Sequence, residues 1–481
     1  MAVKFGRLAK YAAILLAATM LSANSASAMS LKEAMAVAVE SNPEIGQAIQ
    51  NREAIEFELR QAKGLYLPSI DLEGSTGVRR LDTPSRRFNG SDEEALSPNE
   101  AGLVIRQTLF DNGARRAEVD RQASRVDGAS FRVLERSEFI GLAVVQDYLE
   151  YILQAQIVVD AKNNVAFHQS ILGDIRDGVQ GGALTDADRL QAEERLYAAR
   201  ARLQEANEEL ETAKIRFYKT VGKPLTSPSK PASVAKALPR SLDDAIGLAR
   251  RNNPRVHMAS SDIDAAAALV DAARASYGPE VVAEGRARVG HDIDGTEDRT
   301  SDLQARLVLR WNLYRGGIDQ ANEQEQIRRV SEQRLALHQV QREVDEAVRI
   351  SWERRFRQAE IAKTLRQQAA ASDRLVVTYR EQYNVGQRSL LDVLDAQNTR
   401  FNTENLANIS AFASLFAEYR LLAATGQLLS TMNLTPAKQA TAYARSEFNV
   451  PPTADTDTYA RMPSEQVNNL PFDLLAPVRK N

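Results

Sequence analysis

Four short stretches of the chain alternate between apolar and polar residues. In the clearest of them, Leu303 and Leu307 fall on one face and Arg306 on the other. A period of two residues predicts a strand whose faces meet different surroundings. Each stretch has about the ten residues that a tilted strand needs to cross the hydrocarbon layer of a membrane. The four predicted strands cover residues 66–79, 101–110, 280–290 and 303–314.

Two arrangements explain this alternation. In a soluble sandwich, one face packs into a core and the other faces water. In a membrane barrel, the apolar face meets lipid and the charged face lines a water-filled channel. Four strands cannot close a barrel, and an open edge in lipid leaves backbone groups unpaired at a cost of several kcal/mol each. We therefore expect chains to pool their strands, since known bacterial barrels begin at about eight strands and three chains supply twelve.

Two long stretches contain neither proline nor a turn cluster. They cover residues 112–173 and 317–383, and each predicts a single helix. A helix of about 65 residues is roughly 100 Å long, far beyond the usual globular length. Apolar residues spaced by three or four, such as Val144 and Tyr148, form a coiled-coil seam. Because the other faces are highly charged, we expect these helices to associate in water as a bundle or tube.

A glycine-containing turn ends each long helix, and a second helix then returns. Thr185 with Asp188, and Ser389 with Asp392, have the spacing of a capping box, in which a hydroxyl and a carboxylate satisfy free backbone amides. The turns therefore form the far tips of two helical hairpins. Their sequences are DGVQGGALTDAD (177–188) and YNVGQRSLLDVLD (383–395).

The chain contains two copies of one unit. SLKEAMAVAVESNP (30–43) aligns with SLDDAIGLARRNNP (241–254) at an offset of 211 residues. After a loop that is seven residues shorter in the second half, QTLFDNG (107–113) aligns with WNLYRGG (311–317) at an offset of 204. Each half predicts the order helix, helix, strand, strand, very long helix, turn, long helix. The expected fold class is thus an internally duplicated α+β membrane protein.

The repeat and the local composition divide the chain into five segments. After Leu434 prolines accumulate and periodicity fades, so we expect an irregular, partly disordered tail there. The segments are a signal peptide (1–28), a first repeat (29–222, with its hairpin at 112–222), a linker (223–240), a second repeat (241–430, with its hairpin at 316–428) and the proline-rich tail (431–481).

The first residues predict export. Lys4, Arg7 and Lys10 precede an apolar run over 11–23 that is too short to span a bilayer. Ala-Ser-Ala follows at 26–28, and we expect cleavage after the second alanine. The sequence contains no cysteine, so we expect neither a lipid anchor nor disulfides.

Composition excludes several other classes of protein. A net charge of −3, from 61 basic and 64 acidic residues, argues against a nucleic-acid binder. After the signal no run of 18 apolar residues occurs, so any membrane crossing is expected to use strands. We find no phosphate-binding loop and no paired carboxylates in a plausible cleft, and therefore expect no cofactor and no catalytic residue. The four histidines lack ligand spacing, so we expect no metal; they are His168, His257, His291 and His338.

The second hairpin resembles that of TolC-like outer-membrane channels, also known as outer membrane efflux proteins. The resemblance rests on YNVGQRSLLDVLDAQNTRFNTENLANISAFASLFAEYRLLAATGQL (383–428) and GGALTDADRLQAEERLYAARARL (181–203). The LFDNG and LYRGG corners and the duplicated SNP and NNP segments extend it over about residues 30–430. It implies a homotrimer with a twelve-strand β-barrel in the outer membrane, a twelve-helix α-barrel forming a periplasmic tunnel, and a mixed belt around its middle.

The resemblance also implies a gate at the hairpin tips. The family holds this gate shut by hydrogen bonds and ion pairs between neighbouring hairpins, and the matching positions are Tyr383, Arg388 and Asp188. Ala187 departs from the pattern, because the family has a hydroxyl-bearing residue there that helps to lock the gate. A plain structural role is the alternative, with Tyr383 a packed aromatic residue and Arg388 a solvated one.

Two acidic rings of the family match Asp392 and Asp395. These residues lie three apart on one helical face, so threefold symmetry gathers six carboxylates around the axis. Such a ring favours cations and resists anions. For Asp392, as for Asp188, the alternative is a capping role only.

These features together predict a passive exit duct. By the resemblance, its partners are two further copies, outer-membrane lipid, a periplasmic membrane-fusion adaptor and an inner-membrane transporter of the ABC or RND type, in a Gram-negative bacterium. We expect type I protein secretion as its route, since the missing lipid-anchor cysteine removes one group of drug-efflux channels. Multidrug or small-molecule efflux is the alternative. A soluble periplasmic coiled-coil scaffold is a more distant one.

Overall fold

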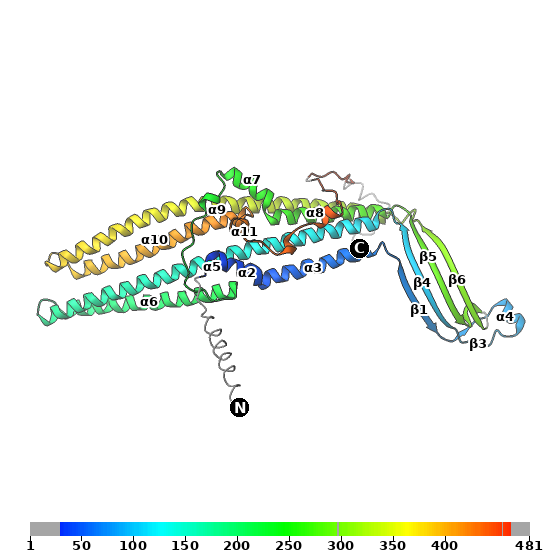
Figure 1. The fold of residues 1–481 in the computed structure, drawn as a ribbon, viewed down its shortest axis with the longest axis horizontal. Helices are drawn as coiled ribbons and strands as arrows, with labels where there is room; N and C mark the ends of the chain where they lie inside the picture. Colours follow the sequence, from blue (N-terminus) through cyan, green and yellow to red (C-terminus); the bar gives the residue numbers. More distant parts are fainter. Residues whose placement is uncertain (1–28, 296–297, 455, 463–481) are drawn as a thin grey trace, which may run out of the picture. The chain divides into compact units, whose positions relative to one another are not determined.

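The computed structural model describes residues 29–295, 298–454 and 456–462 (Figure 1). The predicted signal peptide lies outside the described residues. The chain divides into two compact units, which we call the hairpin unit and the sheet unit. Within the described residues, the hairpin unit comprises 29–46, 136–253 and 344–437, and the sheet unit comprises 47–135, 254–343 and 438–462, with the gaps given above.

The sheet unit contains a four-stranded antiparallel sheet in the order β1-β4-β5-β6. Among the described residues, no strand pairs with the outer edge of β1 or of β6. A short hairpin of β2 (Arg79–Arg80) and β3 (Ala95–Leu96), with helix α4 (Pro84–Asn89), lies between β1 and β4 in sequence. The four strands are β1 (Ser69–Thr76), β4 (Asn99–Phe110), β5 (Glu280–His291) and β6 (Arg299–Arg310).

The pairing register gives the sheet one apolar and one charged face. Leu72, Leu103, Ala287 and Leu303 lie in one row across all four strands. The next row, one residue along, holds Glu73, Gly102, Arg288 and Asp302 on the opposite face. The apolar face is uncovered within this chain, since Leu72 is 81% and Leu303 is 85% exposed.

Two strands have boundaries that differ by three or more residues from the expected ones. The fourth strand was expected at 303–314 but spans 299–310, because Arg310 pairs with Glu280 and the next partner, Pro279, has no N–H to extend the ladder. Trp311 instead donates from its indole nitrogen to the Tyr277 carbonyl oxygen at 2.9 Å. The first strand was expected over 66–79 and begins only at Ser69, after a turn and Pro68.

Helices of equal length occur in both halves of the sequence. The helices α2 (Leu31–Ser41) and α7 (Leu242–Asn252) have 11 residues each, and α3 (Pro43–Gly64) and α8 (Pro254–Ala275) have 22 each. The long helices α5 (Ala114–Gln180) and α9 (Ile318–Asn384) have 67 residues each, which corresponds to about 100 Å. Each helix begins within two residues of the start that the sequence predicts and continues past the predicted C-terminal end. Among the described residues, no helix combines the length and the apolar character that a membrane span requires.

The hairpin unit ends in two returning helices. As Figure 1 shows, α6 (Asp186–Val221) runs back along α5, and α10 (Leu390–Ala424) runs back along α9. Near the tips, Ile171 and Ile175 of α5, Leu196 of α6 and Leu394 of α10 bury one another in a single cluster, against which Tyr383 packs. The hydrophobic seam therefore draws both hairpins into one core.

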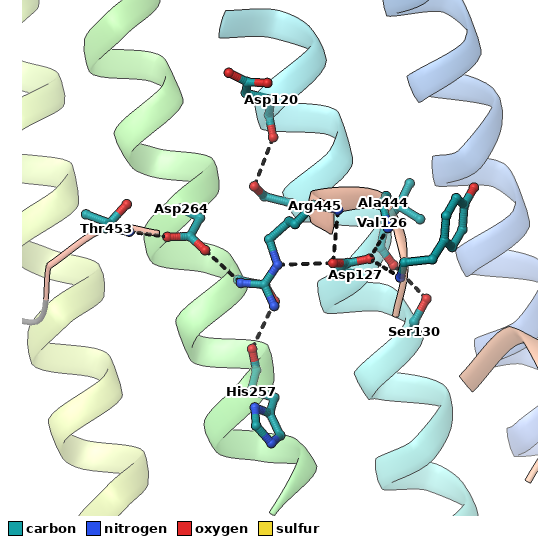
Figure 2. Close-up of polar contacts among 12 residues, drawn as sticks. Asp120, Val126, Asp127, Ser130, His257, Asp264, Ala444, Arg445 and Thr453 are labelled. Carbon is teal, nitrogen blue, oxygen red and sulfur yellow. Dashed lines mark hydrogen bonds and ion pairs between the residues drawn. The ribbon is translucent and has the colours of Figure 1, made fainter. Parts of the chain in front are cut away.

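The described residues of the C-terminal segment, 438–454 and 456–462, make specific contacts within the sheet unit. The segment is irregular apart from η3 (Lys438–Ala440) and α12 (Ala444–Glu447), yet Ala444 is buried with Leu59 of α3 and Val126 of α5. Arg445 lies between the carboxylates of Asp127 and Asp264 (Figure 2). Specific polar contacts thus fix a segment in which the hydrophobic pattern gives no sign of structure.

Candidate functional site

The two hairpin tips are built alike. The turn after α5 has Gly182 at φ 76°, and the turn after α9 has Gly386 at φ 75°, a left-handed conformation that favours glycine. Each return helix then starts with a complete capping box, as the sequence predicts. Thr185 caps α6, and Ser389 caps α10.

Asp188 and Asp392 both take part in these caps. The Thr185 hydroxyl and backbone N–H donate to Asp188 Oδ2 at 2.7 and 3.0 Å. These two bonds hold the pKa of Asp188 below its usual range, so the exposed carboxylate stays ionised. In the second hairpin, the Ser389 hydroxyl donates to Asp392 Oδ2 at 2.9 Å. The capping role is therefore present for both residues.

Arg388 contacts its own hairpin. Its guanidinium lies 4.3 Å from the centre of the Tyr379 ring and 3.8 Å from Asp392 Oδ2, and Nε donates to Gln382 Oε1 at 3.1 Å. Tyr383, a few residues earlier, is half-buried against the tip cluster. Burial, with a smaller contribution from the Asp188 carboxylate, raises the pKa of Tyr383, so its hydroxyl stays protonated and able to donate.

Asp395 has a partner that the sequence did not suggest. Arg195 of α6 places Nη2 3.3 Å from Asp395 Oδ1, joining the first hairpin to the second. The two residues are 200 positions apart, and no motif links them. Both side chains are partly exposed, so the pair adds at most about 1 kcal/mol to stability. It does, however, offset part of the negative charge predicted for the acidic ring.

A buried polar layer lies behind the tip. Gln397 of α10 donates to Asn164 of α5 at 2.9 Å, and Arg202 of α6 donates to Asn398 of α10 at 2.6 Å. His168 of α5 is buried nearby, and burial followed by the charges of neighbouring arginines lowers its pKa to about 4. His168 is therefore neutral at physiological pH. Within the described ranges, no group of three or more His, Cys, Asp and Glu side chains is arranged to hold a metal ion.

A family model described as "Outer membrane efflux protein" matches residues 35–223 and 245–427, which is most of the chain. This chain belongs to that family. The predicted family resemblance is thereby confirmed. Members of the family and their solved relatives are channel proteins, so the chain is an outer-membrane channel component and not an enzyme. The soluble scaffold is excluded on the same ground.

Individual relatives agree with this assignment. "Outer membrane efflux protein BepC" of Brucella suis is 25% identical over 87% of this chain and 90% of its own. "Proteases secretion protein PrtF" of Dickeya chrysanthemi is 22% identical over 79% of this chain and 85% of its own. The crystal structure of the Campylobacter jejuni CmeC outer membrane channel superposes with a TM-score of 0.73 at 16% identity, covering 83% of this chain and 86% of that one. This last likeness establishes the fold alone.

Proposed function

We propose that three copies of this channel protein assemble into one passive export duct. The observation that carries the proposal is a sheet with an exposed apolar face, whose outer edges at β1 and β6 have no partner strand among the residues that the structure describes. In lipid such edges need partners, and joining β6 of one copy to β1 of the next satisfies both. Three copies supply twelve strands, which is within the range of closed outer-membrane barrels.

The hairpins support the same assembly. Several large apolar side chains on α6, α9 and α10 remain exposed in the single chain, although these helices work in water. Burying an apolar side chain against a neighbouring copy stabilises it by about 1.5 to 3 kcal/mol. A twelve-helix tunnel formed by three copies would cover them. The residues are Leu190, Tyr197, Val377, Leu391, Leu406 and Ile409.

The two halves are proposed to descend from one duplicated unit. The matched lengths of α2 and α7, of α3 and α8, and of α5 and α9 support this. On this proposal residues 29–222 and 241–430 are the two repeats, and 223–240 link them. Each repeat contributes two strands and one hairpin, so the proposed trimer contains six similar repeats arranged around its threefold axis.

The gate is proposed to lie at the hairpin tips. Asp392 and Asp395 would form its acidic rings, and Tyr383, Arg388 and Asp188 would make its locking contacts. In favour of this, Asp188 is kept ionised and the Tyr383 hydroxyl is kept protonated. Docking of a periplasmic adaptor and an inner-membrane transporter, of the ABC or RND type, would open the gate.

For cargo we propose type I protein secretion. The relative PrtF is named a proteases secretion protein, which supports this route. Small-molecule efflux is the second candidate, supported by the efflux name and the longer match of BepC. Both routes use the same passive duct, so the fold is compatible with either.

A strain that lacks the protein separates the two routes. Loss of a protein from the culture medium, with unchanged drug susceptibility, supports secretion. Increased susceptibility to drugs and detergents, with an unchanged set of secreted proteins, supports efflux. If the strain that lacks the protein shows neither a secretion defect nor increased drug susceptibility, a role in either route is contradicted.

A further inference from the structure

The charged face of the sheet is divided into zones along the strands. The pairing register places Ser69, Arg106, Glu284 and Arg306 in one row across the four strands, and we call this the basic row. It lies nearer to the strand ends that join the helices. The rows toward the opposite ends, beside the 77–98 connection, carry more acidic residues than basic ones. Those acidic residues are Glu73, Glu100 and Asp302.

In the basic row one carboxylate is covered by two guanidinium groups. Glu284 Oε2 accepts from Arg306 Nε at 2.8 Å, and its Oε1 lies 3.8 Å from Arg106 Nε. The Glu284 side chain is only 12% exposed, whereas Arg106 is 52% and Arg306 is 57% exposed. A molecule that approaches this row therefore meets guanidinium groups, and each chain contributes one uncompensated positive charge.

The row that holds Glu73, Arg288 and Asp302 shows the reverse arrangement. Arg288 is only 16% exposed and is surrounded by Glu100 at 3.6 Å and Asp302 at 3.3 Å. There the carboxylates are the more accessible groups. The basic row thus differs from the row of Arg288 and Asp302 in the sign of the charge that it presents to solvent.

A small hollow in the sheet surface lies beside the basic row. Its charged and polar lining consists of Arg106, Arg286, Arg306 and Gln304 together with the carboxylates of Glu73 and Glu284. Arg286 faces Glu100 at 3.7 Å, and its buried Nε has no hydrogen-bond partner among the described residues. The half-exposed guanidinium groups of Arg106 and Arg306 therefore offer N–H donors that a carboxylate, phosphate or sulfate oxygen can reach from the hollow. Arginine suits such groups because its planar fork donates two parallel hydrogen bonds.

We infer that Arg106 and Arg306 form an anion-binding girdle that the anionic groups of cargo meet inside the channel. The inference rests on the proposed trimer, in which the charged face lines the lumen. Two exposed guanidinium groups per chain then give six on one circumference, above three covered carboxylates. Rings of charged side chains set the selectivity of pores. The girdle on the sheet favours multivalent anions, whereas the acidic residues of the hairpin tips favour cations.

Block of the conducting channel by a multivalent anion tests the inference. The purified full-length protein is placed in planar bilayers, and inorganic tripolyphosphate is added to both chambers. We expect Arg106→Gln with Arg306→Gln to weaken the block on the order of tenfold, and more at low salt than at high salt. Arg79→Gln with Arg80→Gln, which removes two arginines of β2 outside the row, is the matched control and should leave the block unchanged.

Two further variants keep the test decisive. Glu284→Gln uncovers the charge of both arginines and should strengthen the block. Arg106→Lys with Arg306→Lys keeps the charge but loses the fork, so the block should be recovered in large part. If the wild-type channel conducts but tripolyphosphate blocks it to the same extent as Arg106→Gln with Arg306→Gln, Glu284→Gln and the control, the girdle alone is overturned. A wild-type protein that never conducts would overturn the proposed duct and the girdle together.

Discussion

Arg445 of the C-terminal segment donates from Nη1 to Asp264 Oδ2 of α8 across 2.7 Å (Figure 2). On its other side the same guanidinium donates from Nε to Asp127 of α5 at 3.1 Å. The Asp127 carboxylate also accepts the backbone N–H groups of Tyr443 and Ala444, and Asp264 accepts that of Thr453. A segment without hydrophobic periodicity thus bridges two helices that are far apart in sequence.

Removing the Asp127 carboxylate should detach this segment. Asp127 is buried, so Asp127→Ala removes one of the two carboxylates that hold Arg445 and leaves three backbone N–H groups without their acceptor. We expect a loss of about 3 kcal/mol in the free energy of unfolding, measured by urea denaturation in detergent. Limited proteolysis should also cleave within 438–462 much faster. The control, Glu447→Gln, removes an exposed pair with Lys63 and should cost less than about 1 kcal/mol. Equal losses in the two variants would refute the bridging role.

His168 should make the hairpin unit sensitive to acid. Its pKa is about 4 in the folded chain and about 6.5 when unfolded, so the unfolded state binds more protons between these values. The contribution is therefore complete above pH 6.5 and is lost as the pH falls toward 4, by up to about 3 kcal/mol. Thermal unfolding between pH 4 and pH 7 measures it. His168→Phe should flatten the pH dependence, whereas the exposed His338→Gln should not; an unaltered slope in His168→Phe would count against the assignment.

Glu138 should act in the opposite direction. It is buried in α5 and accepts the Leu429 N–H at 3.3 Å, and burial raises its pKa to about 7. Its stabilising contribution is present below its unfolded value of about 4.5 and is lost as the pH rises toward 7. Glu138→Gln, which stays neutral, should therefore unfold at a higher temperature than the wild type at pH 8 and at nearly the same temperature at pH 4.5. A variant that is less stable than the wild type at pH 8 would contradict this.

The acidic ring can be tested by removing its carboxylates and, separately, by removing the arginine that lies beside one of them. Asp392→Ala with Asp395→Ala should reduce the preference for cations, measured as a reversal potential across a KCl gradient. Arg195→Gln removes the cation beside Asp395 and should increase that preference. Glu211→Gln, on the exposed surface of α6, is the control, because it removes one negative charge as each aspartate substitution does. If the double variant and the control give the same potential, neither aspartate lines the narrowest point.

Local sequence patterns were sufficient for much of the fold. Thr185 and Asp188, or Ser389 and Asp392, are three residues apart, so a spacing rule finds each cap without knowledge of the tertiary structure. The alternation of Leu303, Ala305 and Leu307 likewise gave the sheet its two faces. The alternation alone could not predict where β6 ends, because that end depends on Pro279, which comes just before the paired strand β5.

Contacts between distant segments were beyond these rules. Arg195 and Asp395 meet only because α6 and α10 pack together at the tip, and Arg445 reaches Asp264 only because the tail crosses α8. No repeat or motif couples these positions. The candidate site residues were found through the family resemblance. The residues that they contact within the chain are seen only in the folded structure.

Disulfide trapping between β1 of one copy and β6 of the next tests the proposed barrel of three chains most directly. The chain has no cysteine, so Leu72→Cys can be combined with a single cysteine at 303, 305, 307 or 309 on the same apolar face. Within one chain these strands are separated by three inter-strand spacings, roughly 14 Å, which no disulfide spans, so every bond formed joins two copies. We predict covalent dimers and trimers, and nothing larger, in oxidised outer membranes for at least one pair. Only monomers in every pair, with each single variant folded and inserted, would contradict an assembly in which neighbouring chains close the sheet.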